Sequence, residues 1–129
     1  MKVIEGINWI MNCTPAFDPT VAFFRDVMGL SMAEQGVPVT DTQFTRYALL
    51  RVPTGEMLEI VEPADEAIGA LYAAPIMSFK VDDLAQARRE LTDNGAKFVA
   101  PIFRAQDHMA WTYFRAPDGH VYQIWSVVE

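Results

Sequence analysis

The sequence is poor in cysteine, histidine and basic residues. Its 129 residues include one cysteine, Cys13, and two histidines, and 10 Lys and Arg stand against 17 Asp and Glu, a formal net charge of −7. A single cysteine excludes an intrachain disulfide and any zinc or iron–sulfur site built from several cysteines. The negative charge disfavours nucleic acid and anionic membranes as partners, because both carry phosphate groups.

Long apolar runs are also missing. The longest, residues 67–77, contains Gly69 and Pro75 and is too short to cross a bilayer. The N-terminal residues carry one basic and several polar side chains, unlike a secretory signal peptide. We therefore expect a cytoplasmic protein without a membrane partner. The composition, 51% hydrophobic and 21% charged, is typical of a globular domain with its own core.

Two segments have the pattern of helices. One begins at Asp18, an acidic N-cap residue followed by the proline favoured at the first helical position, and ends at Gly29. The other begins at Asp82 or Asp83 and ends at Asn94-Gly95. Residues 65–72 are either a short helix or a linker.

Eight strand-like runs surround these helices: residues 3–13, 30–39, 43–52, 57–61, 75–81, 97–103, 109–114 and 121–127. The order strand, helix, three strands thus occurs twice. A turn of the form Pro-x-Gly precedes the last strand of each half, at residues 53–55 and 117–119. We predict one domain, residues 1–129, of two βαβββ modules, about 1–63 and 74–129, joined by a linker, residues 64–73.

Alternation along the strands predicts which side chains share a face, because neighbouring residues in a strand point to opposite sides. Each strand has one apolar face, expected to be covered by a helix; in the first strand this face is Ile7, Trp9, Met11 and Cys13. The opposite faces mix polar and apolar side chains, as in a small-molecule pocket. An open sheet facing solvent is the alternative. The polar members are Asn8, Asn12, Glu59, Ser78, Lys80 and Gln123, and Trp125 and Ile76 stand among them.

Four stretches carry a family resemblance: residues 23–30, 57–60, 81–84 and 116–124. In this order and spacing, the sequence resembles the vicinal oxygen chelate superfamily, which includes glyoxalase I, extradiol dioxygenases, methylmalonyl-CoA epimerase and the bleomycin- and fosfomycin-resistance proteins. The resemblance implies an α+β fold in which two βαβββ modules form a U-shaped mixed sheet around a cavity. It also implies a homodimer, because family members usually dimerise.

The resemblance further implies where a metal ion would bind. Metal-dependent members hold a divalent ion with one side chain from each of four strands, usually His, Glu or Gln. These positions fall here on Glu59, Ile76, Gln123 and Asn8, or on Trp9 instead of Asn8 if the loop after the first strand has no extra residue. Alternation favours Asn8. Isoleucine offers no lone pair and Glu59 is the one anion, so we expect no metal ion and no other cofactor.

The remaining motifs add no second chemistry. His120 is expected in an exposed turn, and His108, before the seventh strand, is expected in a loop, either solvated or at a cavity mouth. Cys13 is expected on a buried, helix-facing side where a thiol is unreactive. No Ser–His–Asp or Cys–His arrangement and no phosphate-binding glycine loop is present in the sequence. The faces of Trp111 and Tyr113 cannot be assigned from the pattern.

Three functions remain. The first is a metal-free protein that binds a small molecule, an aromatic one included, since Trp125 offers a stacking surface. The second is a lyase, isomerase or dioxygenase with Glu59 as general base or in a degenerate metal site, beside Lys80 as ion-pair partner or oxyanion contact. The third is a dimeric interaction module with adaptable methionines. We favour the first, with the ligand-binding residues Asn8, Asn12, Glu59, Ile76, Ser78, Lys80, Gln123 and Trp125.

Overall fold

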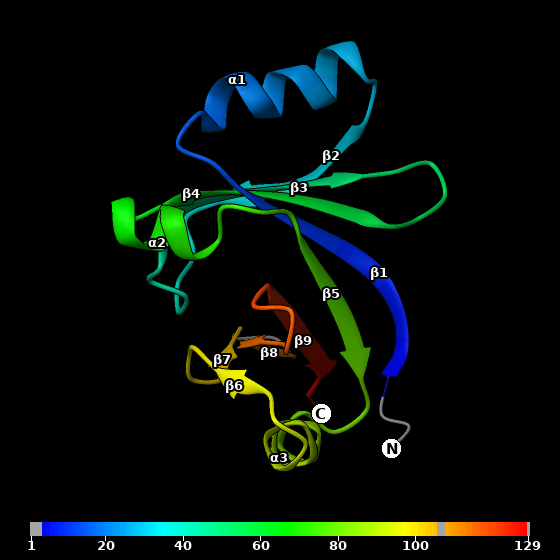
Figure 1. Cartoon of the computed structure of the whole chain (residues 1–129). Coiled ribbons are helices and arrows are strands. Elements are labelled where there is room, and N and C mark those ends of the chain that lie inside the picture. Colours follow the sequence, from blue (N-terminus) through cyan, green and yellow to red (C-terminus); the bar gives the residue numbers. More distant parts are fainter. Residues whose placement is uncertain (1–3, 106–107, 129) are drawn as a thin grey trace. The chain divides into compact units, whose positions relative to one another are not determined.

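The computed structural model describes residues 4–105 and 108–128. These residues form two compact units, which are described separately. The N-terminal unit is residues 8–76, and the C-terminal unit is residues 77–128 together with residues 4–7. Each unit has the predicted strand, helix and following strands (Figure 1), so the predicted α+β class is confirmed.

The N-terminal unit contains a four-stranded mixed sheet in the order β2-β3-β4-β1. Strand β1 is parallel to β4, and the other neighbours are antiparallel. The predicted start of β1 at Val3 lies outside the described residues. The elements are β1 (Ile4–Cys13), α1 (Phe17–Ala22), the π-helical turn η1 (Phe23–Val27), β2 (Ser31–Gly36), β3 (Phe44–Arg51), β4 (Met57–Pro63) and α2 (Glu66–Leu71).

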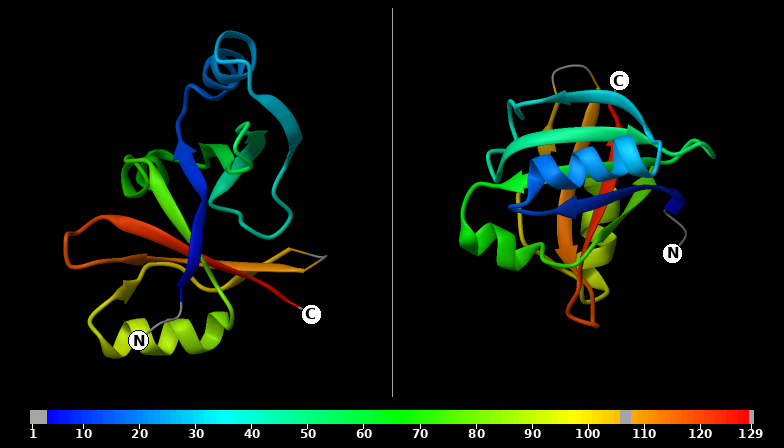
Figure 2. Two further views of the ribbon diagram at one scale, coloured as in Figure 1. Left: turned by 90° about the vertical axis from the view of Figure 1, so that its right-hand side faces the viewer. Right: turned by 90° about the horizontal axis from the view of Figure 1, so that it is seen from above.

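The C-terminal unit repeats this arrangement, with strand order β5-β9-β8-β6 and β7 also paired to β8. Strand β5 is parallel to β9, and β8 and β9 form a long antiparallel hairpin (Figure 2). The single strand predicted for residues 97–103 is instead two short strands, because Pro101 between them has no N–H for the ladder. The elements are β5 (Ile76–Val81), α3 (Leu84–Asp93), β6 (Lys97–Phe98), β7 (Phe103–Arg104), β8 (Met109–Arg115) and β9 (Val121–Val127).

Helix α1 covers one face of the N-terminal sheet. Phe17 and Val21 pack on Ala48, Leu50 and Ile60 to form a buried cluster. The helix begins two residues earlier than predicted, because its N-cap is Ala16 and not Asp18.

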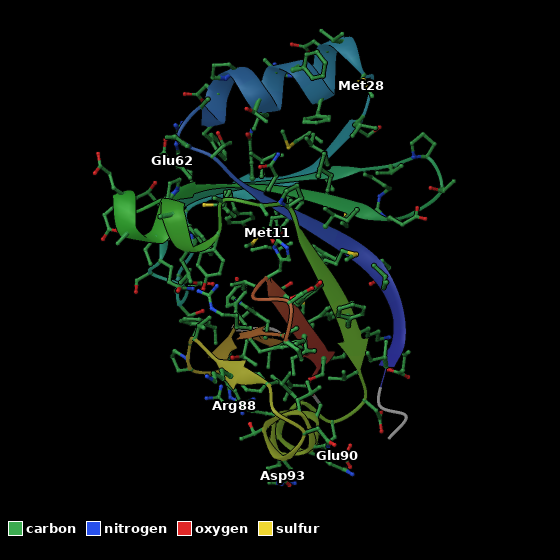
Figure 3. The ribbon with its side chains drawn as sticks, viewed as in Figure 1. Met11, Met28, Glu62, Arg88, Glu90 and Asp93 are labelled. Carbon is green, nitrogen blue, oxygen red and sulfur yellow. The ribbon has the colours of Figure 1, made fainter. Side chains whose placement is uncertain are left out.

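Arg46 holds the beginning of α1 against the sheet. Its guanidinium donates hydrogen bonds to Asp18 and Glu62 and lies 4.4 Å from the centre of the Phe17 ring. Glu62 lies beside the first turn of α1 (Figure 3). The carboxylate of Asp18 therefore joins α1 to β3. At the other end, Gly29, with φ +78°, ends the helical segment as predicted.

Helix α3 covers one face of the C-terminal sheet and confirms the second predicted helix. Asp83 caps it by accepting a hydrogen bond from the Gln86 N–H at 3.0 Å, and Gly95 follows its end with φ +99°. The core beneath it contains the buried residues Val81, Leu84, Ala87, Ala110, Phe114 and Ile124.

Residues 65–72 form a helix rather than an unstructured linker. Asp65 accepts a hydrogen bond from the Ile68 N–H and caps α2. The Tyr72 hydroxyl donates to Gln43 Oε1 at 2.8 Å, and Gln43 in turn donates to the buried Asp41. This chain of bonds fixes α2 to the segment before β3. Among the described residues, no helix combines the length and the apolarity needed to span a membrane.

Candidate functional site

In the N-terminal unit, the sheet face turned away from α1 combines apolar side chains with one carboxyl group. Strand pairing sets Glu59 of β4 between Met11 of β1 and Leu49 of β3. Met11 is fully buried and lies on the side of the sheet opposite α1 (Figure 3). Val61, two positions after Glu59, is also buried on this face. We call the face made by Trp9, Met11, Leu49, Glu59 and Val61 the Glu59 face.

The predicted faces of β1 were wrong. Asn12 pairs with Ile60, a residue of the core under α1, whereas Met11 pairs with Glu59. By alternation, Asn8 and Asn12 lie on the α1 side, and Trp9 lies on the Glu59 face. Both sides of β1 carry large apolar residues, so the residue pattern alone does not show which side faces α1. An error of one residue in the register moves every side chain to the other face. Of the two positions that the resemblance left open, the structure favours Trp9 over Asn8.

Glu59 is held by an indole. Trp9 Nε1 donates a hydrogen bond to Glu59 Oε1 at 3.2 Å, and no described residue donates to Oε2. The side chain is half-buried. Burial raises the pKa of Glu59 to about 7, with smaller contributions from the negative charges of Asp41 and Glu34, although the Trp9 hydrogen bond opposes the rise. Near neutral pH, the Glu59 carboxyl can therefore both accept and release a proton.

Two further carboxyl groups contribute negative charge to this part of the unit. Asp41 is buried and accepts hydrogen bonds from the backbone N–H and the side-chain amide of Gln43. Glu34 accepts a hydrogen bond from the Tyr47 hydroxyl at 2.8 Å. Because both raise the pKa of Glu59, they also disfavour an anionic group beside it.

The C-terminal unit has its own polar group of side chains, on the sheet face away from α3. Ser78 pairs with Gln123 and Lys80 pairs with Trp125, so these four predicted residues share one face. Ser78, Gln123 and Trp125 are buried, and the Lys80 ammonium lies 5.6 Å from the centre of the Trp125 ring. The pairing of β8 with β9 adds Tyr113 to this face.

Ser78 has an unusual environment. Its hydroxyl is fully buried and has no hydrogen-bond partner among the described residues. An unpaired buried hydroxyl costs free energy, so its presence in the core calls for an explanation. Glu59 and Gln123 belong to different units, and the prediction that they share one cavity stays a prediction.

The positions that correspond to metal ligands in the resemblance do not fit a divalent ion. Trp9 presents an N–H donor, and Ile76 is a buried hydrocarbon side chain, so neither offers a lone pair. Within residues 4–105 and 108–128, no three His, Cys, Asp or Glu side chains are grouped as a metal site requires. His108 and His120 are both exposed.

Cys13 is a buried residue of the N-terminal unit. Burial raises the pKa of its thiol to about 11, which keeps it protonated near neutral pH. It lies on the Glu59 face rather than on the predicted α1 side, because it pairs with Val61. Its burial agrees with the expectation from the sequence, and its low reactivity stays a prediction.

Comparison with known proteins assigns the family. The model of the Glyoxalase/Bleomycin resistance protein/Dioxygenase superfamily matches residues 6–124. Methylmalonyl-CoA epimerase from Mycobacterium tuberculosis has a similar structure, with a TM-score of 0.80, 19% identity, and coverage of 100% of this chain and 92% of that one. A variant methylmalonyl-CoA epimerase from Streptomyces coelicolor, in complex with 2-nitronate-propionyl-CoA, gives a TM-score of 0.77 at 21% identity, covering 96% and 95%.

A hypothetical protein from Bacillus halodurans C-125 is also similar, with a TM-score of 0.76, 13% identity and coverage of 96% and 95%. No curated protein sequence matches the chain significantly. At these identities the structural matches show the fold, while the family model covers nearly all of the sequence. The chain therefore belongs to the Glyoxalase/Bleomycin resistance protein/Dioxygenase superfamily, as its motifs indicated.

Proposed function

We propose that this chain binds a small molecule against the Glu59 face and that it does so without a metal ion. The observation that carries the proposal is the half-buried Glu59 carboxyl, held at one oxygen by Trp9 and set among apolar side chains. An apolar surface with one oriented polar group is typical of ligand pockets, where the polar group selects the ligand and fixes its orientation.

The geometry favours a particular ligand chemistry at this face. Oε2 of Glu59 is the oxygen to which no described residue donates, so a ligand group that donates a hydrogen bond or releases a proton suits it. The neighbouring carboxylates of Glu34 and Asp41 disfavour an anion there. We therefore expect the part of the ligand that meets Glu59 to be neutral or cationic, with a flat or apolar portion against Trp9.

The second candidate is a proton-transfer enzyme with Glu59 as general base. It is favoured by the Glu59 pKa of about 7, since a base works best when its pKa is near the working pH. Several structurally similar proteins are methylmalonyl-CoA epimerases, which are isomerases. In such a reaction Glu59 would take a proton from a carbon acid and return it to the resulting carbanion, and inversion at that carbon would require the carbanion to turn or a second acid to act on its other face.

Ligand binding is tested by thermal shift with a panel of small aromatic and polar compounds, in the presence of a strong chelator. The proposal predicts that some compounds raise the melting temperature of the wild type. Glu59→Leu should weaken binding of these compounds by about 10-fold or more, because it removes a charge-assisted hydrogen bond. Glu62→Gln, on the same strand but beside Arg46, should leave binding unchanged. Equal binding by Glu59→Leu and wild type would refute the proposal.

Proton transfer is tested by the uptake of solvent deuterium into carbon acids that have no anionic group beside the acidic carbon, with methylmalonyl-CoA, which has one, as the comparison substrate. If Glu59 is the base, Glu59→Gln should exchange about 100-fold more slowly or worse, while binding stays within a few-fold because the amide keeps the shape of the carboxyl. A chain that binds compounds but exchanges no proton is a binding protein. The homodimer and the cytoplasmic location stay predictions.

A further inference from the structure

The four metal-ligand positions of the resemblance are chemically unequal in this chain. Glu59 and Gln123 carry oxygen atoms, whereas Trp9 and Ile76 carry none. The indole nitrogen of tryptophan is a donor only, because its lone pair belongs to the aromatic ring. Ile76 is 1% exposed and fills its position with hydrocarbon. Half of the expected coordination sphere is therefore replaced by groups that cannot bind a cation.

The Trp9 donor is directed at Glu59 itself. Trp9 pairs with Met57 and Met11 pairs with Glu59, so the indole reaches diagonally across two adjacent parallel strands to the carboxyl group. The contact joins residues 50 positions apart in the sequence, at 3.2 Å. It fixes one oxygen of the carboxyl and leaves the other without a donor from the described residues.

We propose that Trp9 is the positioning residue of Glu59 and that its N–H takes the place which a divalent ion occupies in metal-dependent members of the superfamily. Both a metal ion and an indole N–H fix the orientation of a carboxyl group. They differ in charge: a divalent cation holds the carboxylate ionised, whereas a neutral donor leaves it able to take up a proton. With the indole in place of the ion, Glu59 no longer ligates a metal. It can instead accept a hydrogen bond or a proton from a bound molecule.

This inference rests on the proposed function for the role of Glu59 toward a ligand. The hydrogen bond from Trp9 to Glu59 and the lack of a metal site can be tested without any ligand. The probe is the indole N–H resonance of Trp9 in the ¹⁵N-labelled full chain, identified as the signal that is lost in Trp9→Phe. A hydrogen bond to a carboxyl group shifts this resonance, and an amide acceptor shifts it less. Glu59→Gln should therefore move the signal.

Glu62→Gln is the matched control, since it makes the same chemical change three residues further along β4, where the carboxylate contacts Arg46. It should leave the Trp9 signal in place. One equivalent of Zn²⁺, Ni²⁺ or Mn²⁺ should also leave the Trp9 signal in place. Competition with a fluorescent chelator should show no metal site with a dissociation constant below about 1 µM.

Two results would overturn the inference. One is a Trp9 signal that is the same in wild type and Glu59→Gln, because the hydrogen bond would then be absent in solution. The other is a single metal ion bound more tightly than about 1 µM and lost in Glu59→Gln. Either result is distinguishable from failure of the proposed function, which is judged by whether Glu59→Leu loses the compounds that stabilise the wild type.

Discussion

Trp9 and Glu59 lie 50 positions apart in the sequence and are joined by a hydrogen bond of 3.2 Å between the indole N–H and one carboxyl oxygen. The bond links β1 to β4 in the N-terminal unit and holds a half-buried acid among apolar side chains. Ionising a carboxyl group in this setting costs free energy. Glu59 therefore lowers the free energy of unfolding at neutral pH. This cost makes Glu59 the best candidate for a functional group in the described residues.

The first prediction concerns stability and pH. The pKa of Glu59 is about 7 in the folded chain and 4.5 for an ordinary glutamate, so between these values the folded state binds more protons than the unfolded state. The free energy of unfolding should therefore fall as pH rises from about 4.5 to 7, by up to about 3 kcal/mol, and level off above. Glu59→Gln should remove this slope and exceed the wild type in stability at pH 8. Urea unfolding of both proteins at pH 5 and pH 8 measures the difference, and an equal pH dependence would contradict it.

Glu62 should show the opposite dependence. Hydrogen bonds from Arg46 and Thr45 lower the pKa of this carboxyl to about 2. Its contribution to stability is therefore present above about pH 4.5 and is lost as pH falls toward 2. Glu62→Gln should be less stable than the wild type at pH 7 and equally stable near pH 2. Urea unfolding of the wild type and Glu62→Gln at pH 7 and pH 2 provides the measurement, and a deficit of the variant that persists at pH 2 would count against the Arg46 contact as its cause.

The third prediction concerns the hydrogen bond itself. Because the Trp9 N–H lowers the pKa of Glu59 against the effect of burial, Trp9→Phe should raise that pKa further above 7. Phenylalanine keeps an aromatic ring at the position but donates no hydrogen bond. The ¹³C chemical shift of the Glu59 carboxyl, followed from pH 4 to pH 9 in both proteins, gives the two values. A lower pKa in Trp9→Phe would mean that the indole acts on Glu59 by burial rather than by donation.

The fourth prediction concerns Ser78. Its buried hydroxyl has no partner among the described residues, so Ser78→Ala should raise the free energy of unfolding by about 1 kcal/mol. Thr112 is the contrasting control. Its buried hydroxyl donates to the Ala100 carbonyl at 3.0 Å and accepts from Arg88 at 3.1 Å, so Thr112→Val should lower stability by about 1–2 kcal/mol. Chemical unfolding measures both, and a destabilised Ser78→Ala would show that the hydroxyl is satisfied in solution.

The helices and most strands were predictable because their signals are local. The capping carboxylate of Asp83 and the left-handed Gly95 mark the two ends of α3 in the sequence itself. The N-cap of α1 is Ala16, two positions before the predicted Asp18, and the Asp18 carboxylate instead accepts a hydrogen bond from Arg46, a residue 28 positions away. Local patterns therefore located the elements but not the contacts between them.

The site was only partly predictable. Glu59 lies on the predicted face of β4, and Ser78, Lys80, Gln123 and Trp125 share a face, whereas their roles toward a ligand stay predictions. Asn8 and Asn12 were placed on the wrong side, because both faces of β1 contain large apolar residues and only the register with β4 decides between them. Trp9 as the partner of Glu59 was missed for the same reason. The one available signal was the resemblance, which offered Trp9 as the alternative to Asn8.

Binding of a small molecule at the Glu59 face is tested most directly by mapping where a stabilising compound binds. The measurement is the change in backbone amide resonances of the ¹⁵N-labelled full chain when the compound is added in the presence of a chelator. The largest changes in the N-terminal unit should fall on Trp9, Met11, Leu49 and Glu59. Changes confined to the α1 side, at residues such as Val21, or changes that occur only after a divalent metal ion is supplied, would contradict metal-free binding at the Glu59 face.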